Sequence, residues 1–433
     1  MIIFSCAPRN SGIEESNEQG GIVITWKLET NFATEKGGHK AWFKIHNLKD
    51  EPLGDSGWEL YWNMAPRTVK QETIDGPVTI EWINGDFYRM KPVAGFKLEP
   101  DQEIQITYYG LGSMIKESDA PLGLYIVYYD DDGKETRRVA VHDYSIEPFT
   151  TPEQINRSKD DKEPIPDPAW RFEQNQNVDL TDENKLLRVI PSPANIELAS
   201  EVIVLTSDYA VYYSTNLEDE AKLLASDLKE LLGEDVEIIK EAEAGPDRIL
   251  LRVVEEYDPE SYVLSISPKG IVIEGGDAAG LFYGTRSLLA MLPVEAYQTP
   301  KKKLELNVAI IKDGPAFGYR GFHLDVARNF NSKETVLKLL DVMAFYKLNK
   351  LHLHLTEDEA WRIEIEELPE LTEIGGFRGH TLDDARYLQP AYGSGPEPDP
   401  DNSYGSGYYS REDYKEILRF ATARHIEVIP EIN

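Results

Sequence analysis

The sequence contains a single cysteine among 433 residues and no long hydrophobic run. One thiol forms no intrachain disulfide, and it offers too few ligands for a structural metal site built from cysteines. A membrane-spanning helix needs about 18 to 20 consecutive apolar residues, which no stretch of this sequence approaches. We therefore expect no transmembrane segment and a fold held together by its apolar cores.

Basic side chains are also in the minority. The 77 Asp and Glu residues outnumber the 45 Lys and Arg residues and give a formal net charge of −32 at pH 7. Phosphate backbones and anionic lipid surfaces repel such a chain, so nucleic acid is not expected as a partner. Neutral ligands such as sugars are unaffected by this argument, and the charge also suits a soluble exported protein.

The lone Cys6 follows Ile3-Phe4-Ser5 and precedes a polar run from Arg9 to Gly20. A small residue, a cysteine and a flexible tether in this order resemble the end of a bacterial lipoprotein signal, although its charged start and most of its apolar core are missing. Either the true start lies upstream of Met1, or Cys6 has no role. On the first interpretation the protein is exported, as a periplasmic or outer-membrane lipoprotein with a lipid anchor.

Length and sequence pattern divide the chain into several segments, because 433 residues suffice for about three domains. The predicted organisation is a signal remnant or tether over 1–20, a β-sandwich over 21–150, a linker over 151–185, an α+β domain over 186–313 and the first part of a (β/α)8 TIM barrel over 314–433.

Local patterns support each part of this multidomain fold. Short alternating runs such as Ile22–Leu28 and Trp58–Trp62 predict the closely spaced strands of a sandwich. Exposed aromatic residues on such a module can stack on sugars, but they are more often core or edge residues, so a structural spacer is favoured over a sugar-binding module. In the α+β domain, the glycines of Gly275–Gly284 between a strand and a helix can hold a phosphate. Their spacing does not fit the dinucleotide fingerprint, so a tight turn is favoured.

The last segment alternates strands and helices, with strands predicted at Gly321–Val326, Lys350–Thr356 and Ile426–Ile432 and helices capped by Asn331 and Ser410. This order predicts parallel β/α units, and three strands cannot close an eight-stranded barrel. The long connection between Thr356 and Tyr409 greatly exceeds the usual ~2 to 6 residues, so we expect it to border a site.

Polar side chains gather at the predicted carboxyl ends of these strands, where β/α barrels carry their working face. The first strand ends in Asp325 and Arg328, the second is followed by Glu357, Asp358, Glu359 and Trp361, and the third ends in Glu431 and Asn433. Carboxylates and a guanidinium pair with hydroxyl groups, and an indole stacks on a sugar ring. Each residue alone is explained as an ordinary loop charge, but the three ends together favour a polyhydroxylated ligand.

His352 and His354 point to one side of their predicted strand, as metal ligands do. A barrel metallohydrolase is therefore a rival enzyme class, but the remaining ligands are not evident, because His323 is alone on the first strand. Buried, hydrogen-bonded histidines are favoured, and we predict no metal site.

Four motifs then resemble the β-N-acetylhexosaminidases of glycoside hydrolase family 20, including chitobiases. They are, in order, Tyr319–Phe330, Met343–Leu355, Trp361–Glu364 and Val428–Asn433. The passage Gly280–Thr285 is similar to the α+β domain that precedes the barrel in this family. The sandwich resembles, more weakly, the family's carbohydrate-binding-type N-terminal module.

The resemblance implies an exo-acting hydrolase without a cofactor, which removes terminal β-linked N-acetylglucosamine or N-acetylgalactosamine from N-acetylhexosamine-containing glycans with retention of configuration. In this family the 2-acetamido oxygen of the substrate attacks the anomeric carbon, assisted by an Asp-Glu pair. That pair belongs after the fourth strand. The chain is therefore expected to be a fragment that ends after the third barrel strand, contains no catalytic residue and is inactive alone.

The resemblance also assigns sugar-binding roles. Arg328 matches the arginine that holds the outer hydroxyls of the non-reducing sugar. Glu357 and Asp358 stand where the family has two aspartates, and Asn433 stands where Asp is frequent. The predicted substrate-binding residues are Arg328, Glu357, Asp358, Trp361, Glu431 and Asn433. A non-catalytic glycan-binding protein, in which the sandwich alone acts, is the other alternative to this enzyme.

Overall fold

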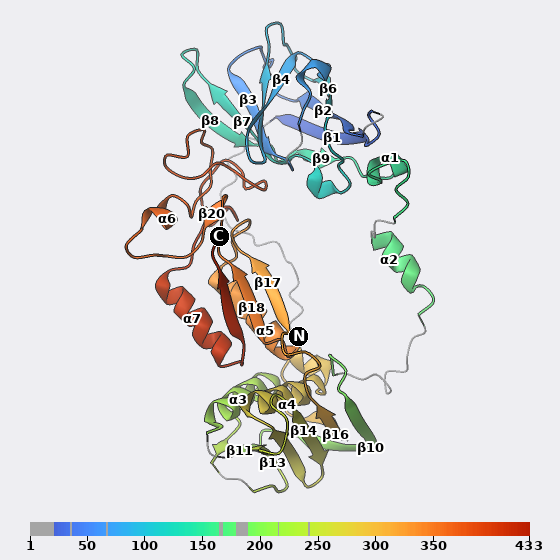
Figure 1. Ribbon diagram of the computed structural model, residues 1–433, viewed down its shortest axis with the longest axis vertical. Coiled ribbons are helices and arrows are strands. Elements are labelled where there is room, and N and C mark those ends of the chain that lie inside the picture. The colour runs from blue at the N-terminus through green and yellow to red at the C-terminus, as the bar shows by residue number, and fades with distance from the viewer. Residues whose placement is uncertain are drawn as a thin grey trace.

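The computed structural model (Figure 1) describes residues 21–433, apart from 35–36, 66–67, 164–167, 179–188, 215 and 241–242. Three bodies follow one another along the chain, as the predicted fold class requires: a β-sandwich, an α+β domain and a small parallel sheet covered by helices. Figure 1 shows the parallel sheet between the other two bodies. Cys6 and the rest of the predicted tether lie outside the described residues.

Among the helices of the described ranges, none has both the length and the apolar character that crossing a bilayer requires.

Two sheets form the sandwich, with strand orders β6-β2-β1-β9 and β4-β5-β3-β7-β8. The strands are β1 Ile22–Thr30, β2 His39–Asn47, β3 Trp58–Asn63, β4 Val78–Asn84, β5 Phe87–Pro92, β6 Gln102–Gly110, β7 Leu122–Tyr129, β8 Glu135–Ala140 and β9 Tyr144–Ile146, with single 3-10 turns η1 Gln71–Thr73 and η2 Glu117–Asp119. Buried and less buried residues alternate along β1 and β2. This alternation is the sequence pattern from which strands were predicted in the sandwich. Trp26, Phe43 and Trp62 lie in the core between the sheets.

The segment predicted as a linker begins with a short helix, α1 Pro152–Ile155, that is bonded to the sandwich. The Gln154 side chain donates to the carbonyl of Leu28 at 2.6 Å, and Asn31 donates to the carbonyl of Gln154 at 2.7 Å. Further on lies a second helix, α2 Pro168–Asn175, which has no buried residue.

The α+β domain is a seven-stranded sheet in the order β10-β16-β14-β15-β13-β11-β12. Its elements are β10 Asn195–Leu205, β11 Ala210–Tyr213, α3 Glu218–Leu232, β12 Ile238–Ile239, β13 Arg248–Val253, β14 Tyr262–Ser267, β15 Gly270–Gly275, α4 Ala278–Ala290, η4 Val294–Tyr297 and β16 Leu304–Asp313. The tight turn predicted before α4 is confirmed. Asp277 caps the helix by accepting from the Gly280 N–H at 2.7 Å, and a Cβ on Gly276 would lie 2.1 Å from the Asp258 carbonyl oxygen.

The last body is a parallel sheet in the order β17-β18-β21, and residues of two helices share an apolar core with β18. Its elements are β17 Gly321–Asp325, α5 Lys333–Phe345, β18 Lys350–His354, β19 Thr356–Glu357, β20 Ala360–Trp361, α6 Glu370–Glu373, α7 Arg411–Thr422 and β21 Glu427–Glu431. The strands and the Ser410 cap of α7 agree with the prediction. The cap predicted at Asn331 is wrong, because Ser332 accepts from the Thr335 N–H while Asn331 bonds the carbonyl of Asn329.

The α+β domain holds the amino ends of the parallel strands. Arg320, which directly precedes β17, donates to Glu260 and to the Tyr283 hydroxyl, both at 3.0 Å. Asn349, which precedes β18, donates to Glu260 as well. The carboxyl ends of the strands therefore point away from this domain and toward the sandwich (Figure 1).

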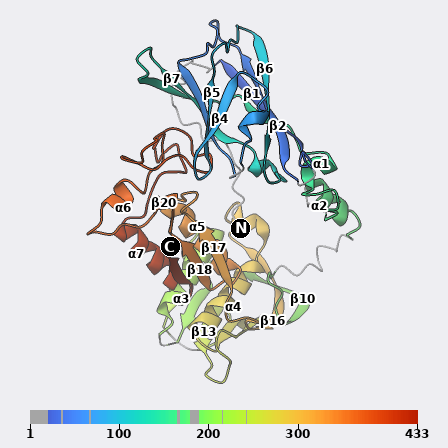
Figure 2. The same ribbon diagram turned by 45° about the horizontal axis from the view of Figure 1, so that its top comes forward.

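The loop over 362–409 covers the outer face of the five-stranded sheet of the sandwich. Tyr61, Phe87 and Tyr125 form a small buried cluster on that face. His380 from the loop packs edge-on against Tyr61 with ring centres 4.7 Å apart, and its Nδ1 lies 2.9 Å from the Tyr125 hydroxyl. Figure 2 shows the loop against the sandwich from a second direction. Burial, reinforced by the charge of Arg138, lowers the pKa of His380 to about 4.

The same loop is fastened to the barrel segment by Arg362, whose side chain is fully buried. Its guanidinium donates to five carbonyl oxygens at 2.9–3.1 Å, which belong to Val326, Ala327, Gly376, Gly405 and Gly407. A guanidinium has five N–H donors, so its hydrogen-bonding capacity is filled. Burial and the nearby charge of Arg378 lower the pKa of Arg362 to about 9.

Replacement of Arg362 by Met should destabilise the protein by about 3 to 5 kcal/mol, because five carbonyl groups lose a charged donor in a buried place. Urea unfolding measures the loss, and limited proteolysis of the loop over 362–409 locates it. The exposed Arg419 on α7 provides the control, since Arg419→Met should change stability by less than about 0.5 kcal/mol. Equal stability of the two variants would contradict this role for Arg362.

Acid should loosen the contact between the loop and the sandwich through His380. Its folded-state pKa of about 4 lies below the ordinary 6.5, so the folded protein loses stability as the pH falls from 6.5 toward 4. The variant His380→Asn keeps a hydrogen-bonding group for Tyr125 and should lack the part of this stability loss that comes from His380. Melting temperatures measured between pH 7.5 and 4 test this prediction. The exposed His142 provides the control: the difference in melting temperature between wild type and His142→Asn should stay constant over this pH range.

Candidate active site

The side chains of the site converge because three parallel strands pair in register. Asp325, His354 and Glu431 are direct partners at the carboxyl ends of β17, β18 and β21. Successive side chains on a strand point to opposite faces, so these three share one face. The alternate residues Leu351 and Leu353 are buried in the apolar core on the other face.

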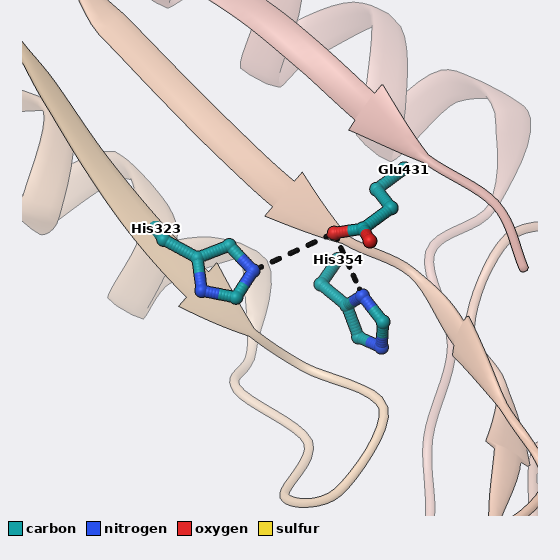
Figure 3. A group of neighbouring side chains, drawn as sticks. All are labelled: His323, His354 and Glu431. Carbon is teal, nitrogen blue, oxygen red and sulfur yellow. Dashed lines mark ion pairs between the residues drawn. The ribbon is translucent and has the colours of Figure 1, made fainter.

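Glu431 is the acceptor at the centre of a histidine cluster (Figure 3). Its Oε2 lies 2.8 Å from His354 Nδ1, 2.9 Å from His352 Nε2 and 3.6 Å from His323 Nε2. The hydrogen bond from His354 is the main reason why the pKa of Glu431 is lowered to about 2. Of the two histidines predicted to be buried and hydrogen-bonded, His354 agrees with the prediction. His352 contacts Glu431 but is only half-buried, so the prediction of burial is wrong for it, and His323 is half exposed.

His323, His354 and Glu431 also have the residue types of a metal site, with ligand atoms within 4.8 Å of one another. Ligands held by one tetrahedral zinc ion, each at ~2.1 Å, would lie roughly 3.4 Å apart. The separation of 2.8 Å between Glu431 and His354 is instead that of a charge-assisted hydrogen bond. Hydrogen bonding therefore accounts for the closest contact in the cluster without an ion.

Arg328 lies beside this cluster and binds the carboxylates around it. Its Nη1 donates to Asp325 at 3.0 Å and lies 2.9 Å from His354 Nε2, and its Nη2 donates to Glu357 at 2.6 Å. The Nε is 3.7 Å from Glu359. Desolvation acts to lower the pKa of Arg328, but the charges of Asp325 and Glu357 outweigh it, so the pKa is raised.

The turn after β17 aims the Arg328 side chain at this position. Asp325 accepts hydrogen bonds from the backbone N–H groups of Ala327 and Arg328, each at 3.0 Å. One carboxylate thus both shapes the turn and, through its other oxygen, pairs with the guanidinium.

The β19–β20 hairpin separates the acidic residues that follow β18. Glu357 pairs with Ala360, so Asp358 lies at the hairpin tip and is exposed. Among the described residues no hydrogen bond or ion pair of the Asp358 carboxylate is found. Glu359 instead turns back toward Arg328 and accepts from the Tyr392 hydroxyl at 3.2 Å. The structure thus brings Glu357 and Glu359 to Arg328, and places Asp358 outside this group.

The remaining predicted residues are held by local bonds. The Trp361 indole N–H donates to the Ile363 carbonyl at 2.6 Å, and the half-buried ring packs against the apolar core. The Asn433 N–H donates to the Thr356 hydroxyl at 2.8 Å, which ties the end of β21 to the hairpin. The Asn433 amide lies 3.4 Å from Glu431.

Two residues of the site were not among the predicted binding residues. Glu359 was noted only as a charge near a strand end, although it approaches Arg328. Tyr392 interacts with both Glu359 and Arg328 from the long loop. That loop was predicted to border the site, but nothing in its sequence distinguishes Tyr392 from the other tyrosines beside it.

This arrangement is suited to recognising hydroxyl groups. Carboxylate oxygens accept hydrogen bonds from hydroxyls, and the fork of Arg328 donates to them with fixed geometry. Charges that are already paired and oriented lose little freedom when a ligand arrives. The site therefore offers one donor fork surrounded by acceptors on neighbouring strands.

Comparison with known families gives matches over all three bodies. The model "Glycosyl hydrolase family 20, catalytic domain" matches residues 317–433, and "Glycosyl hydrolase family 20, domain 2" matches residues 186–313. The model "Putative carbohydrate binding domain" matches residues 28–169.

Individual proteins agree with these matches. A β-hexosaminidase of Vibrio vulnificus is 34% identical over 87% of this chain, and an N,N'-diacetylchitobiase of Vibrio harveyi is 33% identical over 88%. The crystal structure of a GH20 exo β-N-acetylglucosaminidase from Vibrio harveyi, in complex with N-acetylglucosamine, superimposes with a TM-score of 0.73 at 26% identity. It covers 95% of this chain.

These proteins are longer than the present chain, whose matches cover 44% and 42% of the two relatives and 57% of the solved chain. The matching segments include the strand ends that carry Arg328, Glu357 and Glu431. The motifs, the order of the domains and these matches show that the chain belongs to glycosyl hydrolase family 20.

Proposed function

We propose that this chain supplies the wall that binds the non-reducing sugar in an exo-acting β-N-acetylhexosaminidase. The enzyme removes terminal β-linked N-acetylglucosamine or N-acetylgalactosamine and retains the configuration through attack by the substrate's acetamido oxygen. The observation that carries the proposal is the contact between Arg328 and Glu357, 2.6 Å apart on neighbouring strand ends. The relatives give no support to a metallohydrolase or to a non-catalytic glycan-binding protein.

The chemistry of the terminal sugar fits this wall. An exo-acting enzyme must recognise the outer hydroxyls of the last sugar, which each both donate and accept hydrogen bonds. Arg328 can donate to a hydroxyl oxygen while Glu357 or Glu359 accepts a hydrogen bond from the same hydroxyl, so that one hydroxyl bonds to two side chains. A site built in this way rejects a ligand that lacks the hydroxyl, because its charged groups are then left unpaired.

The bond-cleaving Asp-Glu pair of the family follows the fourth barrel strand, whereas this chain contains the strands β17, β18 and β21. The chain alone should therefore release no nitrophenol from a nitrophenyl N-acetylglucosaminide, while a protein extended through a complete barrel should turn it over. Measurable hydrolysis by residues 1–433 alone would show that the catalytic pair has been misplaced.

In the protein with a complete barrel, Arg328→Ala should reduce kcat/KM for this substrate by about 100-fold or more, because hydrogen bonds to a charged group contribute about 1.5 to 3 kcal/mol each. The kcat/KM of Arg328→Lys should lie between the values for wild type and Arg328→Ala, since lysine keeps the charge but not the forked guanidinium. Arg411→Ala, which removes an exposed ion pair with Glu366, is the control and should leave the kinetics unchanged. Unaltered kinetics in Arg328→Ala would refute the proposal that Arg328 binds the terminal sugar.

We further propose that the protein is exported by a bacterium as a lipoprotein anchored through Cys6. The order of a small residue, Cys6 and a polar tether supports this proposal. When the gene is expressed with its upstream sequence in a bacterial host, labelled palmitate should enter the wild-type protein and not Cys6→Ser. Equal labelling of both proteins, or none of either, would contradict the anchor.

A further inference from the structure

One turn of the long loop, Ala391-Tyr392-Gly393, bridges the sandwich and the site. Its backbone lies against the sandwich, because the Tyr392 N–H donates to Asp86 Oδ2 at 2.8 Å and the Gly393 N–H donates to Asn63 Oδ1 at 3.0 Å. The side chain of Tyr392 points the other way, and its hydroxyl donates to Glu359 at 3.2 Å. Tyr392 thus contacts both the sandwich, through Asp86, and the sugar-binding wall, through Glu359.

Asn63 is built into this contact with every polar atom of its side chain. The side chain is 1% exposed, at the end of β3. Its Nδ2 donates to Asp86 Oδ1 and to the carbonyl of Pro390, both at 2.8 Å, while its Oδ1 accepts from Gly393. Asn63 therefore holds the carbonyl before the turn and the N–H after Tyr392, and it also orients the carboxylate that binds between them.

The turn has a backbone conformation that other contacts must maintain. Tyr392 has a φ of +53° and Gly393 a φ of +76°, and an ordinary L-residue such as tyrosine pays about 1 to 2 kcal/mol in the left-handed region. The backbone of Gly393 also packs closely on the sandwich, since a Cβ on Gly123 would lie 2.5 Å from the Gly393 carbonyl oxygen. The hydrogen bonds from Asn63 and Asp86 supply the restraint.

The carboxylate of Asp86 is kept in this half-buried place against its own preference for water. Burial raises the pKa of Asp86 to about 6, and the bonds from Tyr392 and Asn63 and the charge of Arg378 only partly oppose it. Arg378 is itself buried, and its guanidinium donates to the backbone carbonyl of Arg328. Two charged groups, Asp86 and Arg378, thus lie between the sandwich and the turn that carries Arg328.

We propose that Tyr392 orients Glu359 and Arg328 of the sugar-binding wall and that Asn63 and Asp86 of the sandwich hold Tyr392 in that position. The inference rests on the proposed function and deepens it, because it gives the sandwich a part in binding the terminal sugar. The Tyr392 hydroxyl reaches Glu359 and Arg328, so it sets the orientation of the groups that meet the sugar hydroxyls. The contribution is to ground-state binding, and the groups that cleave the bond lie elsewhere.

The test uses the protein with a complete barrel and a nitrophenyl N-acetylglucosaminide. Tyr392→Phe and Asn63→Ala should each raise KM about 5- to 20-fold with kcat changed less than about 2-fold, because they remove binding shared by substrate and transition state. The double variant should be no worse than Asn63→Ala alone, since both changes act through one hydroxyl. Asp86→Asn, whose amide oxygen still accepts from the Tyr392 N–H, should retain more affinity than Asp86→Ala.

Asn47 supplies a matched control within the same sandwich. It is likewise buried and makes three hydrogen bonds, to the carbonyls of Glu51 and Leu98 and from the N–H of Lys49, and none of them reaches the barrel segment. Asn47→Ala should lower the melting temperature about as much as Asn63→Ala and leave KM unchanged. This comparison separates a general loss of sandwich stability from the loss of the turn.

The outcomes distinguish the inference from the proposed function. Equal KM values for wild type, Tyr392→Phe and Asn63→Ala, in an active enzyme, overturn the inference alone. A KM raised to the same extent by Asn47→Ala also overturns it, because stability would then explain the effect. Lack of turnover by the wild-type protein with a complete barrel overturns the proposed function and the inference together.

Discussion

The hydrogen bonds of Arg362 are the constraint on which the site depends. A buried guanidinium bonded to five backbone carbonyls joins the turn after β17 to two distant parts of the long loop. The carbonyl dipoles offset only part of the cost of burying this charge, because burial still lowers the pKa of Arg362 to about 9. Arg328 follows directly after the two carbonyls held on the β17 side, so the position of its guanidinium depends on Arg362, a residue that is itself fully buried.

The two outer domains act on opposite ends of the same short strands. The α+β domain grips the amino ends through Arg320 and Glu260, and the sandwich reaches the carboxyl ends through the loop that carries His380 and Tyr392. The parallel sheet itself provides register, which places Asp325, His354 and Glu431 in one row. The sheet therefore sets the relative positions of the side chains at the strand ends. The residues around them come from segments far away in the sequence.

Alternation along strands is the reason why much of the site was predictable. Once β17 and β18 are recognised as parallel strands, Arg328 and Glu357 must emerge at the same rim, and the structure places them in contact. Asp358 shows the limit of this reasoning, since adjacent residues in a tight hairpin point in different directions and Glu359 reaches Arg328 instead. The one-residue shift of the α5 cap from Asn331 to Ser332 has a similar cause, because both residue types cap helices well.

Other features had no local signal. Nothing in the turn Asn84-Gly85-Asp86, which joins β4 and β5, indicates that Asp86 would bind Tyr392. Arg362 was noticed as part of a motif, while its carbonyl partners are supplied by the backbone, which any sequence can provide. Contacts of this kind are decided by how whole segments pack, and sequence patterns within about ten residues carry no information on them.

The separation of the partners along the chain has a consequence for how the protein is made. The bonds from Asn63 and Asp86 to the loop span 306 to 330 residues, which places them among contacts that form late because long stretches of chain must first be closed. The sandwich emerges before the loop during synthesis and can fold as a unit. Its aromatic patch of Tyr61, Phe87 and Tyr125 then faces water until the loop arrives, so a nascent chain passes through a stage with an uncovered apolar surface.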